Sequence, residues 1–216
     1  MKLGYTILFL LYLPLLGICQ PMFSPNFNNF LGETMQNALA NSPVEFMTAE
    51  EQKVVFYMNL ARLEPQVFLN DILIPYVAFY KLNVNGYVKS LYKDLQESSA
   101  NSSFDMQKDL YEVSYTHLTD IGEKGLTGHR GSKGRTFQKR VNELLKTYSA
   151  VSENVGLGFK YPLDNVIGLL IDDGVKDLGH RKAILSSDYN GVGVSLGNHK
   201  DYTYGCVMDF GKRAEK

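Results

Sequence analysis

Two histidines in the same tripeptide context are the residues of this sequence best placed to do chemistry. His129 and His180 each stand between a glycine and an arginine. A glycine before a histidine permits an unusual backbone turn and leaves room for the ring to face a cleft. Two acids have comparable contexts: Glu153 precedes an asparagine and a Gly-x-Gly turn, and Asp173 ends an apolar run before a glycine. These four residues are the candidate site.

Two histidines with one or two carboxylates can ligate a metal ion or form an acid–base pair. Asp173 follows Val166 by seven residues and Leu170 by three, so we expect it on their inward face, where an unpaired acid is costly. Each residue also has a purely structural interpretation. The histidines could cross-link loops by hydrogen bonds, and Glu153 could accept backbone N–H groups and hold the turn that follows it. Asp173 could cap the 176–180 turn. The sequence contains no HExxH helix, nucleophile elbow or P-loop.

The other reactive side chains have simpler predicted roles. His117 lies on a core-facing helical stripe, and we interpret it as a buried structural histidine. His199 is predicted in a hairpin loop, exposed to solvent. Cys206 shares a strand face with Tyr204 and Met208, which indicates a buried small hydrophobe rather than a nucleophile. The two arginines of the tripeptides suit either an anionic ligand or nearby acids such as Asp172.

The elements that must position the site are helices first and a hairpin last. A capping-box spacing at 48–51 begins one helix, and an apolar stripe at helical period predicts a second. Residues 137–148 and 162–173 indicate further helices, and 152–158 a strand that ends in a turn. Two strands at 191–196 and 202–210 are joined by a short loop. This order predicts an α+β fold rather than a parallel βαβ sheet. The stripe of the second helix consists of Met106, Leu110, Val113, His117 and Ile121.

The beginning of the chain has the pattern of a secretory signal peptide. Lys2 precedes a largely apolar run at 5–16, and small residues occupy the positions for cleavage before Gln20. The run is shorter than the roughly 20 residues of a membrane span. A lipid anchor on Cys19 is the alternative. A lipobox has a small residue before its cysteine, however, and this chain has Ile18 at that position. The predicted division is a signal peptide (1–19), an N-terminal arm or linker (20–47), one domain (48–211) and a C-terminal tail (212–216).

Charge and cysteine content limit the partners. The whole chain has a net charge of −1, and removal of residues 1–19 takes away one lysine and no acid. This balance gives no electrostatic reason to expect nucleic acid as a partner. One cysteine remains after cleavage, so the secreted chain forms no internal disulfide and depends on its core.

The order of several short motifs resembles the CAP superfamily (cysteine-rich secretory proteins, antigen 5 and pathogenesis-related 1), especially its bacterial, cysteine-poor branch. The resemblance covers about residues 48–211. The motifs are Asn59-Leu-Ala-Arg62, Gly128-His129, Ser152-Glu-Asn-Val-Gly156, Gly179-His-Arg-Lys-Ala-Ile-Leu185 and Gly191-Val-Gly-Val194.

The resemblance implies an α-β-α sandwich with a central antiparallel sheet and a cleft that holds two histidines and two acids. Some members bind Zn²⁺ or another divalent cation there. Carried over, the histidines fall on His129 and His180, which become candidate metal ligands, and the acids on Glu153 and Asp173, with Asp172 as the alternative to the latter. The family's tryptophan before the fourth acid is replaced by Leu170, and the segment 66–100 is long enough to cover or reshape the cleft.

The functional expectation is therefore a secreted or periplasmic CAP (SCP/PR-1-like) protein that binds an extracellular ligand without catalysis. The ligand class stays open among lipid, cell-envelope component and protein, and we expect no transmembrane segment after signal cleavage. The alternative is a metal-dependent hydrolase or protease that uses the same cleft, with Glu153 as the group that activates water. A structural, cell-wall or matrix-associated protein with a vestigial cleft is a third interpretation.

Overall fold

A four-stranded sheet forms the centre of the molecule. The computed structural model describes residues 22–213, so the expected signal peptide at 1–19 lies outside the described residues. The strands run in the order β1-β3-β4-β2, and the long strands pair in antiparallel fashion while the short β1 lies parallel to β3. Their bounds are β1 Asp105–Met106, β2 Tyr148–Leu157, β3 Gly191–His199 and β4 Thr203–Arg213.

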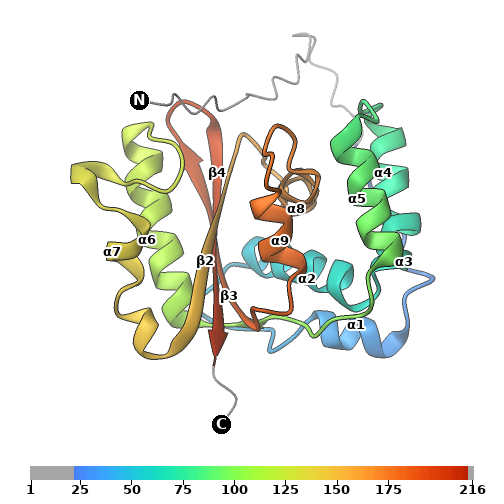
Figure 1. The fold of residues 1–216 in the computed structure, drawn as a ribbon, viewed down its shortest axis with the longest axis horizontal. Helices are drawn as coiled ribbons and strands as arrows, with labels where there is room; N and C mark the ends of the chain where they lie inside the picture. The colour runs from blue at the N-terminus through green and yellow to red at the C-terminus, as the bar shows by residue number, and fades with distance from the viewer. Residues whose placement is uncertain (1–21, 214–216) are drawn as a thin grey trace.

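Helices cover both faces of this sheet. Helix α6 (Lys108–Lys124) packs on β3 and β4 from one side, and α2 (Ala49–Leu63), α8 (Pro162–Ile171) and α9 (Gly179–Leu185) pack from the other. Figure 1 shows these layers, with α6 and α7 to the left of the strands and α8, α9 and α2 to the right. The α+β class and the α-β-α sandwich expected from the sequence are confirmed.

The predicted helical stripe is the core-facing side of α6. Leu110, His117 and Ile121 are buried, whereas Met106 precedes the helix and lies in β1. Gly125 ends the helix in the left-handed conformation at φ 68°, as a glycine C-cap does. A cluster of Leu118, Ile121 and Val207 then joins α6 to β4.

Helix α2 begins with the predicted capping box. The Thr48 hydroxyl accepts from the Glu51 N–H, and the Glu51 carboxylate accepts from the Thr48 N–H. Near its C-terminus, Arg62 is 1 % exposed and donates to the carbonyl oxygens of Ser102 and Ile184 at 2.7 Å each. These bonds connect the helix to the segment before β1 and to the end of α9.

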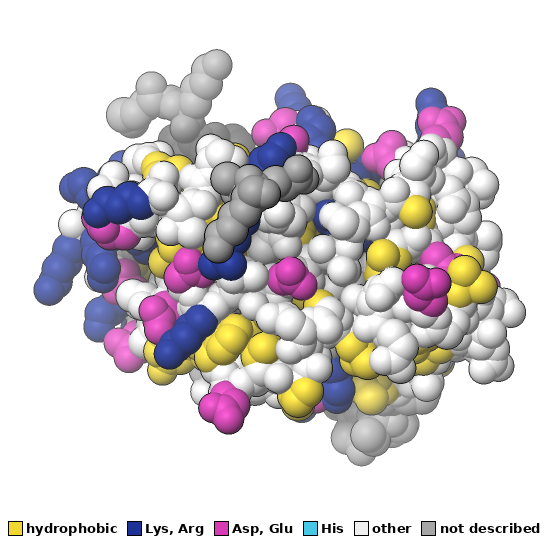
Figure 2. Space-filling model, turned by 90° about the horizontal axis from the view of Figure 1, so that it is seen from below, with side chains coloured by type: hydrophobic (Ala, Val, Ile, Leu, Met, Phe, Trp, Pro, Cys, Tyr) yellow, Lys and Arg dark blue, Asp and Glu magenta, His cyan; other side chains and the backbone are white. Residues whose placement is uncertain are grey.

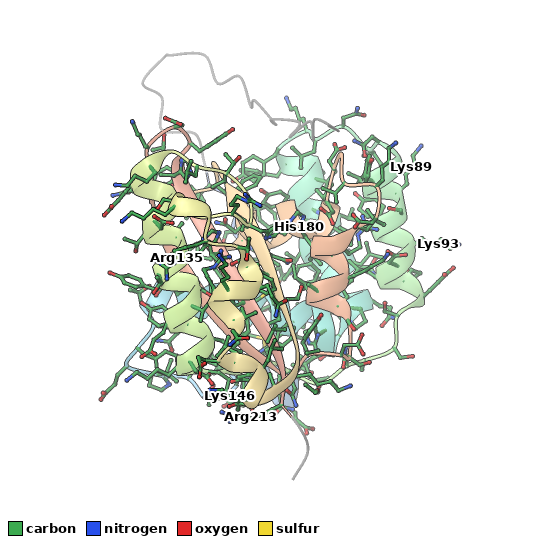
Figure 3. All side chains as sticks on the ribbon, turned by 60° about the vertical axis from the view of Figure 1, so that its left-hand side comes forward. Lys89, Lys93, Arg135, Lys146, His180 and Arg213 are labelled. Carbon is green, nitrogen blue, oxygen red and sulfur yellow. The ribbon has the colours of Figure 1, made fainter. Side chains whose placement is uncertain are left out.

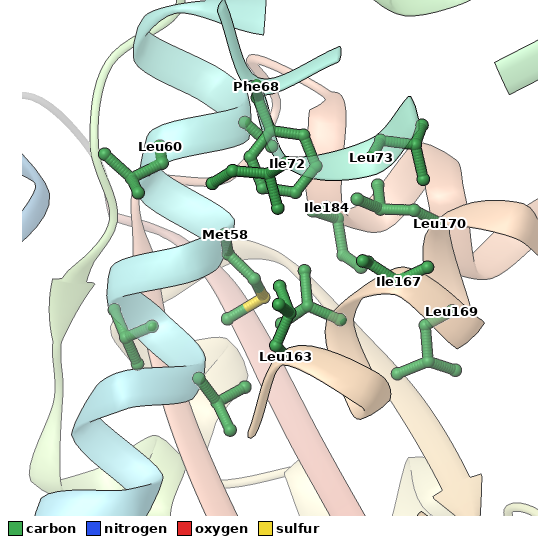
Figure 4. Close-up of a cluster of buried hydrophobic side chains, with 14 of the residues drawn as sticks. Met58, Leu60, Phe68, Ile72, Leu73, Leu163, Ile167, Leu169, Leu170 and Ile184 are labelled. Carbon is green, nitrogen blue, oxygen red and sulfur yellow. The ribbon is translucent and has the colours of Figure 1, made fainter. Parts of the chain in front are cut away.

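The main core lies between α2, α8 and the helical segment 65–79. Figure 4 shows Met58, Phe68 and Ile72 directed toward Ile167 and Leu170 of α8. All five are at most 1 % exposed. The α8 run is apolar on nearly every side because it is covered by the sheet on one side and by helices on the other.

The N-terminal segment is packed onto this body. Residues 22–47 include α1 (Gly32–Ala38), and Phe30, Ala38 and Met47 are buried in the main core. The residues expected to form an arm or linker thus bury apolar side chains of their own, although their asparagines and prolines gave no helical period.

The segment 66–100 is helical throughout most of its length. It contains α3 (Pro65–Val67), a π-helical segment (Phe68–Leu73), α4 (Ile74–Phe79) and α5 (Gly86–Glu97). Asn85 caps the N-terminus of α5, and its side chain accepts hydrogen bonds from the N–H groups of Tyr87 and Val88. No helix in residues 22–213 is both long and apolar enough to cross a bilayer.

The connection between α6 and β2 differs from its prediction. Instead of one helix over 137–148 there are α7 (Phe137–Val141), a 3₁₀ turn (Leu144–Lys146) and the start of β2 at Tyr148, and another 3₁₀ turn (Ser132–Gly134) precedes α7. Tyr148 is 1 % exposed and packs with Leu110 and Leu144. Its ring is therefore buried from the first residue of the edge strand β2, and not from a helix face.

Candidate functional site

Glu153 is the buried acid at the centre of the site. It lies in the middle of β2, opposite Asp209 of β4, and its side chain is only 1 % exposed. One carboxylate oxygen, Oε1, is 2.8 Å from His129 Nδ1, and the other, Oε2, is 2.5 Å from Arg140 Nη2. Both oxygens are therefore engaged, one by a ring and one by a guanidinium.

His129 is the exposed partner of this pair. Its side chain is 53 % exposed, in contrast to the buried carboxylate beneath it. Because an ionised carboxylate can only accept, the ring nitrogen Nδ1 carries the proton of this bond. The neutral ring then presents Nε2 as an unprotonated acceptor, and the fixed tautomer is the chemical consequence of Glu153.

Arg140 joins the loop, the ring and the acid. It belongs to α7, and besides Glu153 it donates from Nη1 to the backbone carbonyl oxygen of His129 at 2.9 Å. Its side chain is 4 % exposed, so the ion pair with Glu153 is formed away from water. One arginine thus fixes both the backbone and the acid partner of His129, a role that the sequence did not reveal.

Two further buried groups surround Glu153. His117 of α6 donates from Nε2 to the Gly128 carbonyl oxygen at 3.0 Å and lies 3.8 Å from Glu153 Oε1. Burial lowers the pKa of His117, opposed by the nearby Glu153 charge. Asp209 accepts from the Ser114 hydroxyl at 2.8 Å, and burial together with Glu153 raises its pKa well above the usual range. The structure confirms that His117 is a buried structural histidine.

His180 forms a second histidine–carboxylate pair, but with Asp172. Its Nδ1 is 2.6 Å from Asp172 Oδ1, and its backbone N–H donates to Asp172 Oδ2 at 2.9 Å. The neighbouring acid, Asp173, accepts instead from the Asn85 side chain at 2.8 Å. The fourth acid of the cleft was expected at Asp173, with Asp172 as the alternative, and it is the alternative, Asp172, that pairs with His180.

The backbone conformation at the end of α8 explains why Asp172, and not Asp173, meets His180. The prediction carried the helical face of α8 on to residue 173, yet the helix ends at Ile171 and Asp172 adopts the left-handed conformation at φ 57° and ψ 39°. Beyond that point the helical spacing no longer tells which side chain faces inward. Asp172 becomes the buried acid, at 3 % exposure, and caps the first turn of α9.

The neighbouring residues Glu153 and Asn154 of β2 contact the two histidines with side chains on opposite faces of the strand. Neighbouring side chains of a strand point to opposite sides. Glu153 turns toward α6 and binds His129, whereas Asn154 turns toward α9 and donates to the His180 carbonyl oxygen at 3.1 Å. Figure 3 shows His180 among the helices on the far side of the strands from Arg135. The Glu-Asn dipeptide thus serves the two histidines separately.

The hydrogen bonds of the two pairs leave few donor atoms free for a metal ion. Within residues 22–213, no three His, Cys, Asp or Glu side chains are grouped so that they can hold a metal ion. A tetrahedral zinc needs its protein ligands at about 2.0–2.3 Å, and both Nδ1 atoms and all four carboxylate oxygens are already hydrogen-bonded. Each ring has only Nε2 left for a ligand.

The two Gly-His-Arg tripeptides place their arginines differently. Arg181 is 2 % exposed and donates to Asp94 and to the carbonyl oxygens of Leu170 and Tyr87. Helix α5 thus braces α9, so the segment 66–100 supports the His180 side of the molecule. Arg130 is exposed. The partner of Arg181 is Asp94, which lies far from it in sequence and could not be found by spacing.

Two other predictions about single residues have opposite outcomes. Cys206 is fully buried, and burial raises the pKa of its thiol, as expected of a small hydrophobe in the core. The prediction that His199 is exposed to solvent is wrong: it is 2 % exposed, and its Nε2 donates to the Leu126 carbonyl oxygen at 2.8 Å. Strands β3 and β4 extend beyond their predicted ends, so His199 lies in a strand against the end of α6.

Comparison with known proteins adds the family. The sequence profile described as "CAP: Cysteine-rich secretory protein family" matches residues 78–210, which is more than half of the chain. No curated protein matches this chain in sequence.

Solved structures with a similar fold include three bacterial proteins. An outer surface protein of Borrelia burgdorferi is 19 % identical with a TM-score of 0.44, and the match covers 62 % of this chain and 97 % of that one. An extracellular protein with an SCP domain from Bacillus anthracis is 16 % identical with a TM-score of 0.43, over 60 % of this chain and 41 % of that one.

The third is a cysteine-rich secretory protein from Staphylococcus aureus, 17 % identical with a TM-score of 0.37, over 59 % of this chain and 39 % of that one. The matched range runs from the last residues of α4 into β4 and includes all the residues of the site. On this match, the chain belongs to the CAP family, the cysteine-rich secretory proteins.

Proposed function

We propose that this chain is an exported CAP domain that binds an extracellular ligand without transforming it, and that His129 contacts the ligand. One observation carries the proposal: the acid of the pair is buried and fully bonded, while the ring is half exposed. The site therefore presents an oriented imidazole and keeps its carboxylate beneath.

The state of Glu153 argues against a hydrolase. A general base must be within hydrogen-bond reach of the water or substrate proton that it removes. Glu153 is 1 % exposed on its side chain, and Arg140 stabilises its charged form by a buried ion pair. An acid held in this way orients the ring and has both oxygens occupied by protein donors. The alternative of a metal-dependent hydrolase or protease also lacks a grouped donor set among residues 22–213.

The ring defines the chemistry of the ligand. Since Nδ1–H is bound to Glu153, the neutral ring offers an acceptor at Nε2, which suits a ligand hydroxyl or N–H group. His180, held by Asp172 and 23 % exposed on its side chain, offers a second acceptor of the same kind. The proposed ligand-binding residues are His129 and His180, oriented by Glu153 and Asp172.

The proposal of export rests on the sequence before residue 20. The charged Lys2, the apolar run and the small residues near Cys19 support cleavage before Gln20. Intact-mass analysis of the protein recovered from the medium or the periplasm tests this. A chain that begins at Gln20 supports export as a free protein, and a lipidated Cys19 contradicts it.

Binding is tested by NMR on the imidazole signals of the mature protein. The probes are two fragment sets of equal size, one with hydroxyl or amide donors and one without donors. We expect the donor fragments to shift the His129 Nε2 signal. Because the site does not transform its ligand, we also expect the fragments to be chemically unchanged after incubation. His129→Ala abolishes the response, whereas His199→Gln, which alters a buried ring elsewhere, keeps it.

Two results contradict the proposal. One is equal shifts by both fragment sets, which means that the ring accepts no specific bond. The other is turnover of donor fragments that is lost in Glu153→Gln, which makes Glu153 a base.

A further inference from the structure

The loop beside His129 is a strongly basic segment of a chain that is nearly neutral as a whole. Residues 128–142 contain five lysines and arginines and no acid, while the whole chain has a net charge of −1. Arg140 is neutralised by Glu153. The other four cationic side chains are exposed: Arg130, Lys133, Arg135 and Lys139.

The backbone of this loop is held in place. The Gly131 N–H donates to the Arg135 carbonyl oxygen at 2.8 Å, and the Ser132 N–H and hydroxyl donate to the Asp120 carboxylate at 2.7 and 2.5 Å. A Cβ atom at Gly131 would lie 2.5 Å from Asp120 Oδ2, so a larger residue there would displace the carboxylate that holds Ser132. Arg130 and Arg135 are therefore brought near each other on a fixed turn.

The four side chains have no carboxylate of the described residues within ion-pair distance. Elsewhere on the surface, Lys53 pairs with Glu50 and Lys146 with Glu143. Asp120, which is close enough to Arg135 for their charges to interact, already accepts two hydrogen bonds from Ser132. Figure 2 shows Lys and Arg side chains gathered at the left-hand edge, the end at which α6 and α7 lie in Figure 1. The four cations are therefore available to an external anion.

We propose that these four residues, here called the basic loop, form a binding site for an anionic polysaccharide of the cell surface. A single small anion is disfavoured because one exposed ion pair contributes little against water and salt. A polymer with repeated sulfate or phosphate groups engages several side chains at once, and linked contacts reinforce one another. The guanidinium groups also match sulfate and phosphate oxygens in bidentate fashion.

The same residues make a membrane or a nucleic acid the poorer partner. A surface helix or loop that enters a bilayer needs apolar side chains beside its cations. Within 128–140 the one large apolar side chain is Phe137, which is partly buried with the Arg140 guanidinium 5.7 Å from its ring centre. Binding of single-stranded nucleic acid relies on aromatic side chains on which bases stack, and the loop presents no exposed Phe, Tyr or Trp.

This site goes beyond the proposed function, because it uses side chains other than His129 and His180. The test measures binding of fluorescent dextran sulfate to the mature protein by anisotropy, at about 50 and 200 mM salt. We expect binding that weakens by about tenfold or more between the two salt concentrations, since counterions are released. Neutral dextran of the same length is expected not to bind.

The variant R130Q/K133Q/R135Q/K139Q is expected to weaken binding by about tenfold or more. Its matched control, K81Q/K89Q/K93Q/K182Q, removes the same charge from exposed lysines, and Figure 3 places Lys89 and Lys93 on the other side of the molecule from Arg135. We expect the control to change binding less than about twofold. If the fourfold variant does not fold, K133Q and K139Q singly are expected to weaken binding by smaller factors.

Three outcomes overturn the proposal: no binding of dextran sulfate, equal losses in the variant and its control, or tenfold stronger binding to phosphatidylglycerol vesicles or to an oligo(dT) strand than to dextran sulfate. His129→Ala separates this site from the proposed function. It removes the fragment response of the ring and is expected to leave dextran sulfate binding within about twofold.

Discussion

Glu153 Oε1 lies 2.8 Å from His129 Nδ1, although the two residues are 24 positions apart and one is buried while the other is half exposed. The buried Glu153 carboxylate thereby fixes the orientation of the exposed His129 ring. Arg140 completes it by binding the second carboxylate oxygen and the His129 carbonyl oxygen. The site is thus a supported imidazole at the edge strand of the sheet, and its stability depends on a buried ion pair.

Removal of the Glu153 charge is expected to destabilise the fold. Glu153→Gln leaves the buried Arg140 guanidinium without a counter-charge, and breaking a buried pair by removing one partner costs about 3–5 kcal/mol. Urea unfolding of the mature protein measures the loss. The control is Glu143→Gln, which breaks the exposed pair with Lys146 and is expected to cost less than about 1 kcal/mol. Equal losses in both variants contradict the buried role of Glu153.

Asp209 makes stability depend on pH. Burial and the nearby Glu153 raise its pKa in the folded chain, so the folded state holds its proton more tightly than the unfolded state. The contribution of Asp209 is therefore favourable below its ordinary pKa of about 3.9 and is lost as pH rises toward the raised folded value.

The Asp209→Asn variant isolates this effect, because the amide oxygen still accepts from the Ser114 hydroxyl and carries no charge. The stability of the variant relative to the natural protein is expected to increase with pH above about 4. Urea midpoints at several pH values measure this difference. A difference that is constant with pH, or that decreases, means that Asp209 is ionised in the fold.

The stripe of α6 is a core surface. Leu110 is fully buried in a cluster with Val141, Leu144 and Tyr148, and its truncation to alanine is expected to cost about 2–5 kcal/mol. Leu145 is 42 % exposed and serves as a control of the same chemistry, with an expected cost below about 0.5 kcal/mol. Unfolding measurements on both variants decide the matter, and a small loss for Leu110→Ala would place the stripe at the surface.

The arginines of the two tripeptides are expected to respond differently to the same substitution. Arg181→Lys removes the planar fork that serves three carbonyl oxygens, Ser90 and Asp94, and is expected to cost about 3 kcal/mol or more. Arg130→Lys at an exposed position is expected to be nearly neutral. Thermal unfolding compares them. Similar melting temperatures for the two variants contradict the brace between α5 and α9.

Local sequence signals predicted much of the fold because each acts over a few residues. The Thr48–Glu51 capping box and the closing hairpin of 191–210 were confirmed. Caps, apolar period and turn glycines depend on neighbours in the chain, so a sequence displays them directly.

The site was predicted less completely because it depends on tertiary contacts. The identities of Glu153, His129 and His180 came from motif order. The ion pairs of Arg140 with Glu153 and of Asp94 with Arg181 join separate elements, and no spacing in the sequence indicates them. The single left-handed residue Asp172 changed which acid meets His180. The basic loop escaped notice because the net charge of the whole chain averages it with acids elsewhere.

The most direct measurement of the central claim is a calorimetric titration of the mature protein with Zn²⁺, repeated on His129→Ala and His180→Ala. The account holds that each ring is bonded through Nδ1 to its own carboxylate, and that β2 contacts the two histidines through different side chains, Glu153 and Asn154. It predicts no stoichiometric site that depends on both histidines, with any weak binding altered independently by each substitution. One zinc ion per chain, lost completely in either variant, would show that the two rings share a metal and would contradict the account.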